Sequence, residues 1–219
     1  MKLSTQSSTQ ELNVKMSKTD QPVPVLGGVH LHSIYNPDRE AEGFISANEK
    51  NFKEESQVLI FGLGFGYHIS KLEARLKALH GDEYRIFVIE PSKELYQRWK
   101  DLRPTSFSSR VKIVQFENVK DFFKDKELVE FLSDKPHVLP HPASFQLNES
   151  FYKSFMSFHY PTTIDESQFF VESEEYSKYL SQAPEGESTE EIFQRVKGKS
   201  FLQKHDFLTL ALSEMVTEK

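Results

Sequence analysis

Short apolar runs alternate with helical patterns through the middle of the chain. Residues 58–61 form an apolar run that ends at a glycine and is too short for a core helix, which indicates a buried parallel strand. Residues 85–89, 111–116 and 137–139 are similar runs. Between the first two runs, apolar residues recur at helical spacing over residues 67–79. Strands that alternate with helices predict an α/β fold with a Rossmann-like, doubly wound and mostly parallel sheet.

The segment before this pattern predicts a tail and the start of a domain. Residues 1–20 are rich in Ser, Thr, Gln and Lys and show no sustained apolar period, so we expect a flexible tail. Residues 29–33 predict a short strand. Asn36-Pro37 predicts a helix start, because asparagine caps helices and proline suits the first helical position. The Rossmann-like domain is therefore expected over residues 21–147.

The pattern becomes helical towards the end of the chain. Residues 121–132 predict one helix with Phe122, Val129 and Leu132 on its inner face. Residues 148–219 predict a helical C-terminal extension that packs on the domain or on a partner chain, a second copy of this chain included. The first apolar stripe of this extension consists of Phe151, Phe155 and Phe158.

Charge and composition exclude several classes of partner. The 219-residue chain has a net charge of −6, whereas nucleic-acid binding needs a basic face, so we expect no nucleic acid. The chain contains no cysteine, which excludes disulfides and cysteine-based metal sites and fits a cytoplasmic protein. No apolar run reaches the roughly 18 residues that a membrane span needs, so no membrane is expected either.

Three glycines and one glutamate mark the expected ligand edge of the sheet. Gly62, Gly64 and Gly66 lie in the turn between the first parallel strand and its helix, where glycine permits positive φ and close approach of a ligand. Glu90 ends the second strand, the position that grips a ribose in Rossmann-type sites. Tyr67 stands where the third glycine of the dinucleotide fingerprint would pack, which argues against NAD(P). Nucleosides, S-adenosylmethionine and nucleotide sugars remain, as does a turn that needs glycine only for packing.

Histidines are the other candidate site residues. His30 and His32 are two apart and would face the same side of a strand. That spacing can hold a metal, but no third ligand is marked nearby, so we expect a hydrogen-bonded pair and no metal. His68 follows the glycines and is expected to be neutral beside a ligand, because it lies at a helix start. No catalytic group can be identified from spacing. The expected ligand-binding residues are Gly62, Gly64, Phe65, Gly66, Tyr67, His68, Glu90, Pro91, Ser92, His32, Ser33, Tyr35, Arg39 and His141.

Three short motifs follow one another along the chain: His32-Ser33-x-Tyr35-x-Pro37-x-Arg39-Glu40-Ala41, Gly62-Leu63-Gly64-Phe65-Gly66-Tyr67-His68 and Ile89-Glu90-Pro91-Ser92. Together with His141-Pro142 and Phe151-Tyr152, they resemble the N-terminal domain of motility-associated factor (Maf) glycosyltransferases over about residues 28–158. Those bacterial proteins are implicated in attaching nonulosonic acids, such as pseudaminic or legionaminic acid, to flagellin Ser/Thr.

In this family, sugar transfer is assigned to a domain that lies beyond the N-terminal one. Only about 60 residues follow here, too few for another α/β domain. The resemblance therefore implies a nucleotide-sugar module without the transferase, either a fragment or a stand-alone relative.

Three functions are consistent with these patterns. The first is a binding module for a nucleotide or nucleotide sugar, over which His32, Tyr35 and Arg39 close. The second is an S-adenosylmethionine-dependent methyltransferase, whose glycine turn and acidic strand tip have the same geometry. Against it, Ile60 stands where many such enzymes carry an acidic residue, and residues 140–142 lack an Asn-Pro-Pro pattern. The third is a non-enzymatic scaffold that docks flagellin or another glycosylation partner through the aromatic C-terminal helices.

Overall fold

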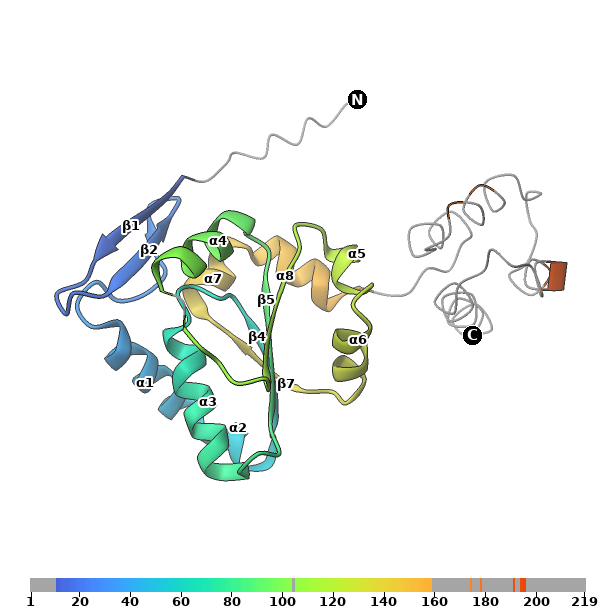
Figure 1. Ribbon diagram of the computed structural model, residues 1–219, viewed down its shortest axis with the longest axis horizontal. Coiled ribbons are helices and arrows are strands. Elements are labelled where there is room, and N and C mark those ends of the chain that lie inside the picture. The colour runs from blue at the N-terminus through green and yellow to red at the C-terminus, as the bar shows by residue number, and fades with distance from the viewer. Residues whose placement is uncertain are drawn as a thin grey trace. The chain divides into compact units, whose positions relative to one another are not determined.

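The computed structural model describes residues 11–103 and 105–158, together with five single residues between 174 and 195 (Figure 1). The chain divides into two compact units, residues 1–156 and 157–219, and every element described below belongs to the first. The predicted extension beyond residue 158 lies outside the continuously described residues. No helix among the described residues is both long and apolar enough to cross a membrane.

Four parallel strands form the central sheet of the first unit. They are β4 (Gln57–Phe61), β5 (Arg85–Glu90), β6 (Val111–Gln115) and β7 (His137–Pro140). Their order is β6-β5-β4-β7 and every pair is parallel. The chain therefore moves outward from β4 in one direction, then returns and places β7 on the other side of β4. The predicted Rossmann-like α/β fold is confirmed, and its topological switch point lies between β4 and β7, where such folds bind ligands.

Helices cover both faces of this sheet, as Figure 1 shows for α1 and α3 on one side and α5 and α6 on the other. The helices are α1 (Pro37–Ala47), α2 (Glu49–Glu54), α3 (Tyr67–His80), α4 (Lys93–Leu102), α5 (Val119–Phe122), α6 (Lys126–Ser133), α7 (Pro142–Leu147) and α8 (Glu149–Met156). Alternate strand residues supply two core clusters. Val58 and Ile60 join α1, α3 and α4, whereas Leu59 and Phe61 join α5, α6 and α8. Both faces of β4 are thus buried, as its continuous apolar run predicts.

A small antiparallel sheet precedes the main sheet and corrects the predicted tail. β1 (Leu12–Met16) pairs with β2 (Pro22–Leu26), which in turn pairs with β3 (Val29–His30). Of the predicted flexible tail, residues 11–20 are described, and they contain β1. The strand predicted over residues 29–33 is shorter and covers Val29–His30. The sequence signal is weak because Leu12 is the only residue of β1 that is fully buried.

The helix predicted over residues 121–132 is two helices. The chain leaves the helical path after α5, and Asp125 caps α6 by accepting hydrogen bonds from two backbone N–H groups. This new start shifts the helical phase. Leu128 and Phe131 are fully buried, whereas Val129 and Leu132, which were expected on the inner face, are only partly buried.

α8 is part of the sheet domain. Its Tyr152 side chain is fully buried, and its ring stacks on Phe61 with centroids 4.7 Å apart. Phe155 is also buried, whereas Phe151 and Phe158 of the predicted stripe are half-buried. The helical extension therefore begins within the first compact unit, which ends after Met156.

Candidate functional site

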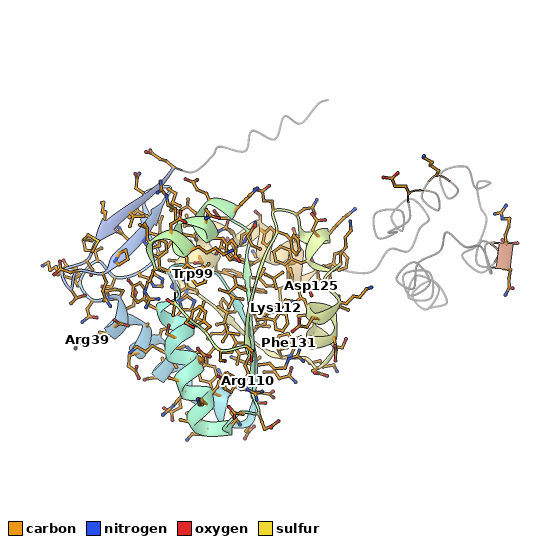
Figure 2. All side chains as sticks on the ribbon, in the orientation of Figure 1. Arg39, Trp99, Arg110, Lys112, Asp125 and Phe131 are labelled. Atoms are coloured by element: carbon orange, nitrogen blue, oxygen red, sulfur yellow. The ribbon has the colours of Figure 1, made fainter. Side chains whose placement is uncertain are left out.

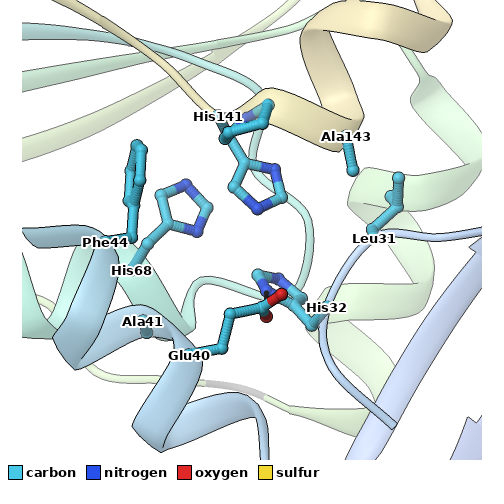
Figure 3. Close-up of a pocket in the computed structure, with 9 residues that line it drawn as sticks. Leu31, His32, Glu40, Ala41, Phe44, His68, His141 and Ala143 are labelled. Carbon is cyan, nitrogen blue, oxygen red and sulfur yellow. Dashed lines mark ion pairs between the residues drawn. The ribbon is translucent and has the colours of Figure 1, made fainter.

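A cavity of about 160 Å³ lies at the switch point, where the chain leaves β4 and β7 (Figure 3). Its polar side chains are His32, Glu40, His68 and His141, and its apolar walls include Leu31, Ala41, Phe44 and Ala143. The cavity therefore occupies the place at which a doubly wound fold binds its ligand.

Three segments bring three histidines together at this cavity. His32 follows β3, His68 is in the first turn of α3, and His141 directly follows β7. The His68 and His141 rings are parallel within 5°, with centroids 4.3 Å apart. The His32 centroid lies 4.9 Å from that of His141. One nitrogen from each ring falls within 4.8 Å of the other two. The sequence indicated each histidine separately, but only the fold shows that they form one cluster.

All three imidazoles are buried and uncharged at neutral pH. Burial, with the nearby His32 and Arg103 adding to it, lowers the pKa of His68 to about 3. Burial also lowers the pKa of His141 well below its usual value. It lowers the pKa of His32, although Glu40 opposes that shift. Each ring in a closely packed, buried group of imidazoles stays neutral. Binding a second proton would charge the ring, which costs desolvation and, once a neighbour is charged, repulsion between the rings.

Hydrogen bonds define what each ring offers to the cavity. The His68 Nε2 group lies 3.0 Å from the Gly62 carbonyl oxygen and donates to it, so Nδ1 carries the lone pair. That Nδ1 atom is buried and has no hydrogen-bond partner within the part of the chain that the structure describes. His141 Nδ1 lies 2.8 Å from Ser144 Oγ. His32 Nε2 accepts from the Phe65 N–H at 3.0 Å, and its Nδ1 lies 3.7 Å from Glu40 Oε2.

The glycine turn is packed under the protein's own side chains. Gly62, Gly64 and Gly66 have φ values of +101°, +51° and +76°, as the sequence predicts for this turn. A Cβ atom at these positions would meet, in order, the side chains of Ser144, His32 and Phe107. Glycine is therefore required here both for the backbone conformation and for close packing.

The Glu90 side chain supports this turn through hydrogen bonds to the backbone. The carboxylate is buried, and its two oxygens accept from the Leu63 N–H at 2.9 Å and the Ser92 N–H at 2.8 Å. Burial raises the pKa of Glu90 to about 7, although these two N–H groups oppose the shift. Ser92 also caps α4, and Pro91 lies between the two. Glu90, Pro91 and Ser92 therefore support the turn and do not line the cavity.

The remaining predicted residues lie around the cavity without lining it. The Tyr67 hydroxyl donates to the Pro22 carbonyl, which ties α3 to the small sheet. Ser33 Oγ accepts from the Tyr35 N–H. Tyr35 is 63% exposed, and Arg39 is exposed at the outer edge of the view in Figure 2.

Three residues that contact or line the site were not among the residues predicted for it. Arg103 donates to the Phe65 carbonyl at 2.8 Å, and its guanidinium lies 3.8 Å from the centre of the Tyr67 ring. Ser144 contacts His141, and Phe44 forms one wall of the cavity. Only Phe44 had a sequence signal, its place on the apolar side of α1. Arg103 reaches the site from the end of α4, whereas Ser144 lies three residues after His141, in the first turn of α7.

Comparisons with known proteins identify no family. No family model matches the chain, and no curated protein matches it. A similar solved structure is MnmC2 from Aquifex aeolicus, with 16% sequence identity and a TM-score of 0.35. The match covers 55% of this chain and 47% of that one, so the chain spans about half the length of that structure. A likeness of this degree carries no argument about function, and the strand order remains the basis for the fold.

Proposed function

We propose that the first unit is a binding module for a nucleotide-type ligand, a nucleotide sugar, whose sugar enters the switch-point cavity. One observation carries this proposal: His68 lines the cavity at the switch point, and its buried Nδ1 lone pair has no hydrogen-bond partner among the described residues. A buried acceptor without a donor costs free energy, and a ligand hydroxyl would remove that cost.

The chemistry of the walls suits a sugar. Neutral imidazoles both donate and accept hydrogen bonds, and the Glu40 carboxylate accepts them from hydroxyl groups. The Phe44 ring supplies an apolar surface for the C–H face of a sugar ring. Glu40 remains 46% exposed, so it lies at the mouth of the cavity.

The size of the cavity limits how much of the ligand it holds. Sites that enclose a whole drug-sized ligand measure about 300–1,000 Å³, whereas this cavity measures about 160 Å³. Only the sugar would therefore enter, and the nucleotide would lie outside near Glu40. Tyr35 and Arg39 are close to Glu40 in the sequence and exposed, so they remain candidates for contacts to base and phosphate.

The resemblance of residues 28–158 to the Maf N-terminal domain supports the nucleotide-sugar class. In this proposal the glycine turn acts indirectly. It positions His68 through the Gly62 carbonyl and His32 through the Phe65 N–H. Sugar transfer itself is not proposed, because none of the described residues forms an identified catalytic group.

Isothermal titration calorimetry with CMP, CMP-activated nonulosonic acids and UDP-sugars tests the proposal. Ala143→Leu extends a side chain into the cavity and should abolish binding of the sugar nucleotides. Ala47→Leu is the matched control, because Ala47 is exposed at the end of α1. Binding by S-adenosylhomocysteine alone would favour the methyltransferase alternative, and binding by none of these compounds would contradict the proposal.

A further inference from the structure

We propose that His32, His68 and His141 form a binding site for one divalent transition-metal ion, zinc or an ion of similar preference. The inference goes beyond the proposed function: the ion would take the His68 Nδ1 lone pair, and a sugar hydroxyl would then bind at the open position of the ion. It rests on three imidazoles from three segments, each offering a nitrogen within 4.8 Å of the others. The three residues line a cavity at the switch point (Figure 3).

His68 already has the arrangement of a metal ligand. Metal-bound histidines usually donate their second ring N–H to a backbone carbonyl, carboxylate or water, which fixes the tautomer. The Nε2 group of His68 donates to the Gly62 carbonyl in this way. The opposite nitrogen, Nδ1, is buried and has no partner among the described residues.

His141 has a comparable arrangement with the nitrogens exchanged. Its Nδ1 lies 2.8 Å from Ser144 Oγ, and in the tautomer in which Nδ1–H donates to Oγ, Nε2 is the coordinating atom. Ser144 therefore acts as a positioning residue for the proposed ligand. The chain contains no cysteine that could offer a softer competing site. Imidazole nitrogens suit zinc, copper, nickel and iron.

The cluster must tighten when the ion enters. Two nitrogens on one zinc ion lie at most about 4.2 Å apart, because each Zn–N bond measures about 2.1 Å. The parallel His68 and His141 rings direct their lone pairs along separate planes, so one ring must turn. At His32 the ion would replace the Phe65 N–H on Nε2, while Glu40 stays close to Nδ1 and supplies negative charge.

Three protein ligands leave one coordination position open. Zinc sites of this kind hold water or a substrate atom at the fourth position. The cavity of about 160 Å³ provides room for that group. The proposed site is therefore open to a ligand, unlike a closed structural zinc site with four protein ligands.

Calorimetry with the metal ion alone tests the inference. The full chain is first treated with a chelator and then titrated with ZnCl₂ or CoCl₂, and we expect one equivalent to bind. His68→Ala should abolish this binding. Ser144→Ala should weaken it about 10- to 100-fold, which is the usual effect of losing a partner of a metal-bound histidine. His137→Ala is the control, because His137 is at the opposite end of β7 from His141.

A measurement on the unaltered chain guards against variants that fail to fold. Histidine ¹⁵N NMR spectra should show zinc shifting the signals of His68 Nδ1 and His141 Nε2. Absence of one-equivalent binding would overturn the inference, as would equal binding by the His68→Ala and His137→Ala variants. Metal binding without any response to nucleotides would retain this site and count only against the proposed function.

Discussion

At the scale of single residues, Glu90 shows how a side chain expected to bind a ligand can instead support the turn above it. Each of its two oxygens accepts a hydrogen bond from a backbone N–H group, of residue 63 and of residue 92. The carboxylate is also buried, so the fold prefers its protonated form. Glu90 therefore makes the stability of the glycine turn depend on pH.

We expect Glu90 to make the protein less stable as the pH rises from about 4.5 to about 7. The unfolded chain releases this proton near pH 4.5, whereas the folded protein retains it until about pH 7. Between these values the folded state binds more protons, so the free energy of unfolding falls by about 3 kcal/mol as the pH rises. Urea unfolding of wild type and Glu90→Gln across this range measures the effect. Parallel pH dependence in the two proteins would contradict it.

Gly64 gives a second prediction at this scale. Gly64→Ala should destabilise the protein by about 3 kcal/mol, since its Cβ would displace His32 and weaken the bond from the Phe65 N–H, in addition to the cost of positive φ. Gly28→Ala is the control. Gly28 also has positive φ, but nothing lies within 4 Å of its added Cβ, so the cost should be about 1 kcal/mol. Equal losses in thermal or urea unfolding would show that His32 does not press on the turn.

At the scale of elements, long-range contacts decide most differences between the predicted and observed structure. The two central strands, β4 and β5, were predictable because each is an apolar run buried on both faces. β1 was missed because its five residues contain one fully buried side chain and depend on pairing with β2. The break before α6 was missed because Asp125 was not recognised as a cap.

The phase of α6 gives a prediction that uses two leucines of one helix. Leu128→Ala should cost about 2–5 kcal/mol, because Leu128 is completely buried against the sheet. Leu132→Ala should cost clearly less, because Leu132 is only partly buried. Urea unfolding of the two variants compares them directly. A larger loss at Leu132 would support the single continuous helix expected from the sequence.

At the scale of the whole molecule, the strand order places the cavity, and the strand order follows from the sequence only in part. Alternating strands and helices predicted the fold class and the edge at which His68 and His141 lie. His32 was also expected at the ligand, but the pattern did not predict how it reaches this point, because its position depends on the antiparallel sheet and on packing over Gly64. The cavity is therefore a property of three distant segments, and no local motif in the sequence describes it.

The division of the chain gives the last prediction, a comparison of two truncated chains. Among the described residues, both core clusters of the first unit draw on positions between 12 and 155, so we expect residues 1–158 to fold alone. The melting temperature of this truncated chain should stay within about 2 °C of that of the sheet domain in the full chain.

Residues 1–147 lack α8, and with it the buried Tyr152 and Phe155 that pack on Phe61. Losing buried aromatic side chains costs about 3–5 kcal/mol each, so this shorter chain should unfold at much lower temperature or fail to fold. Calorimetry and size-exclusion chromatography distinguish the two. If both chains were equally stable, α8 would not belong to the domain, and if both failed, the first unit would need residues beyond 158.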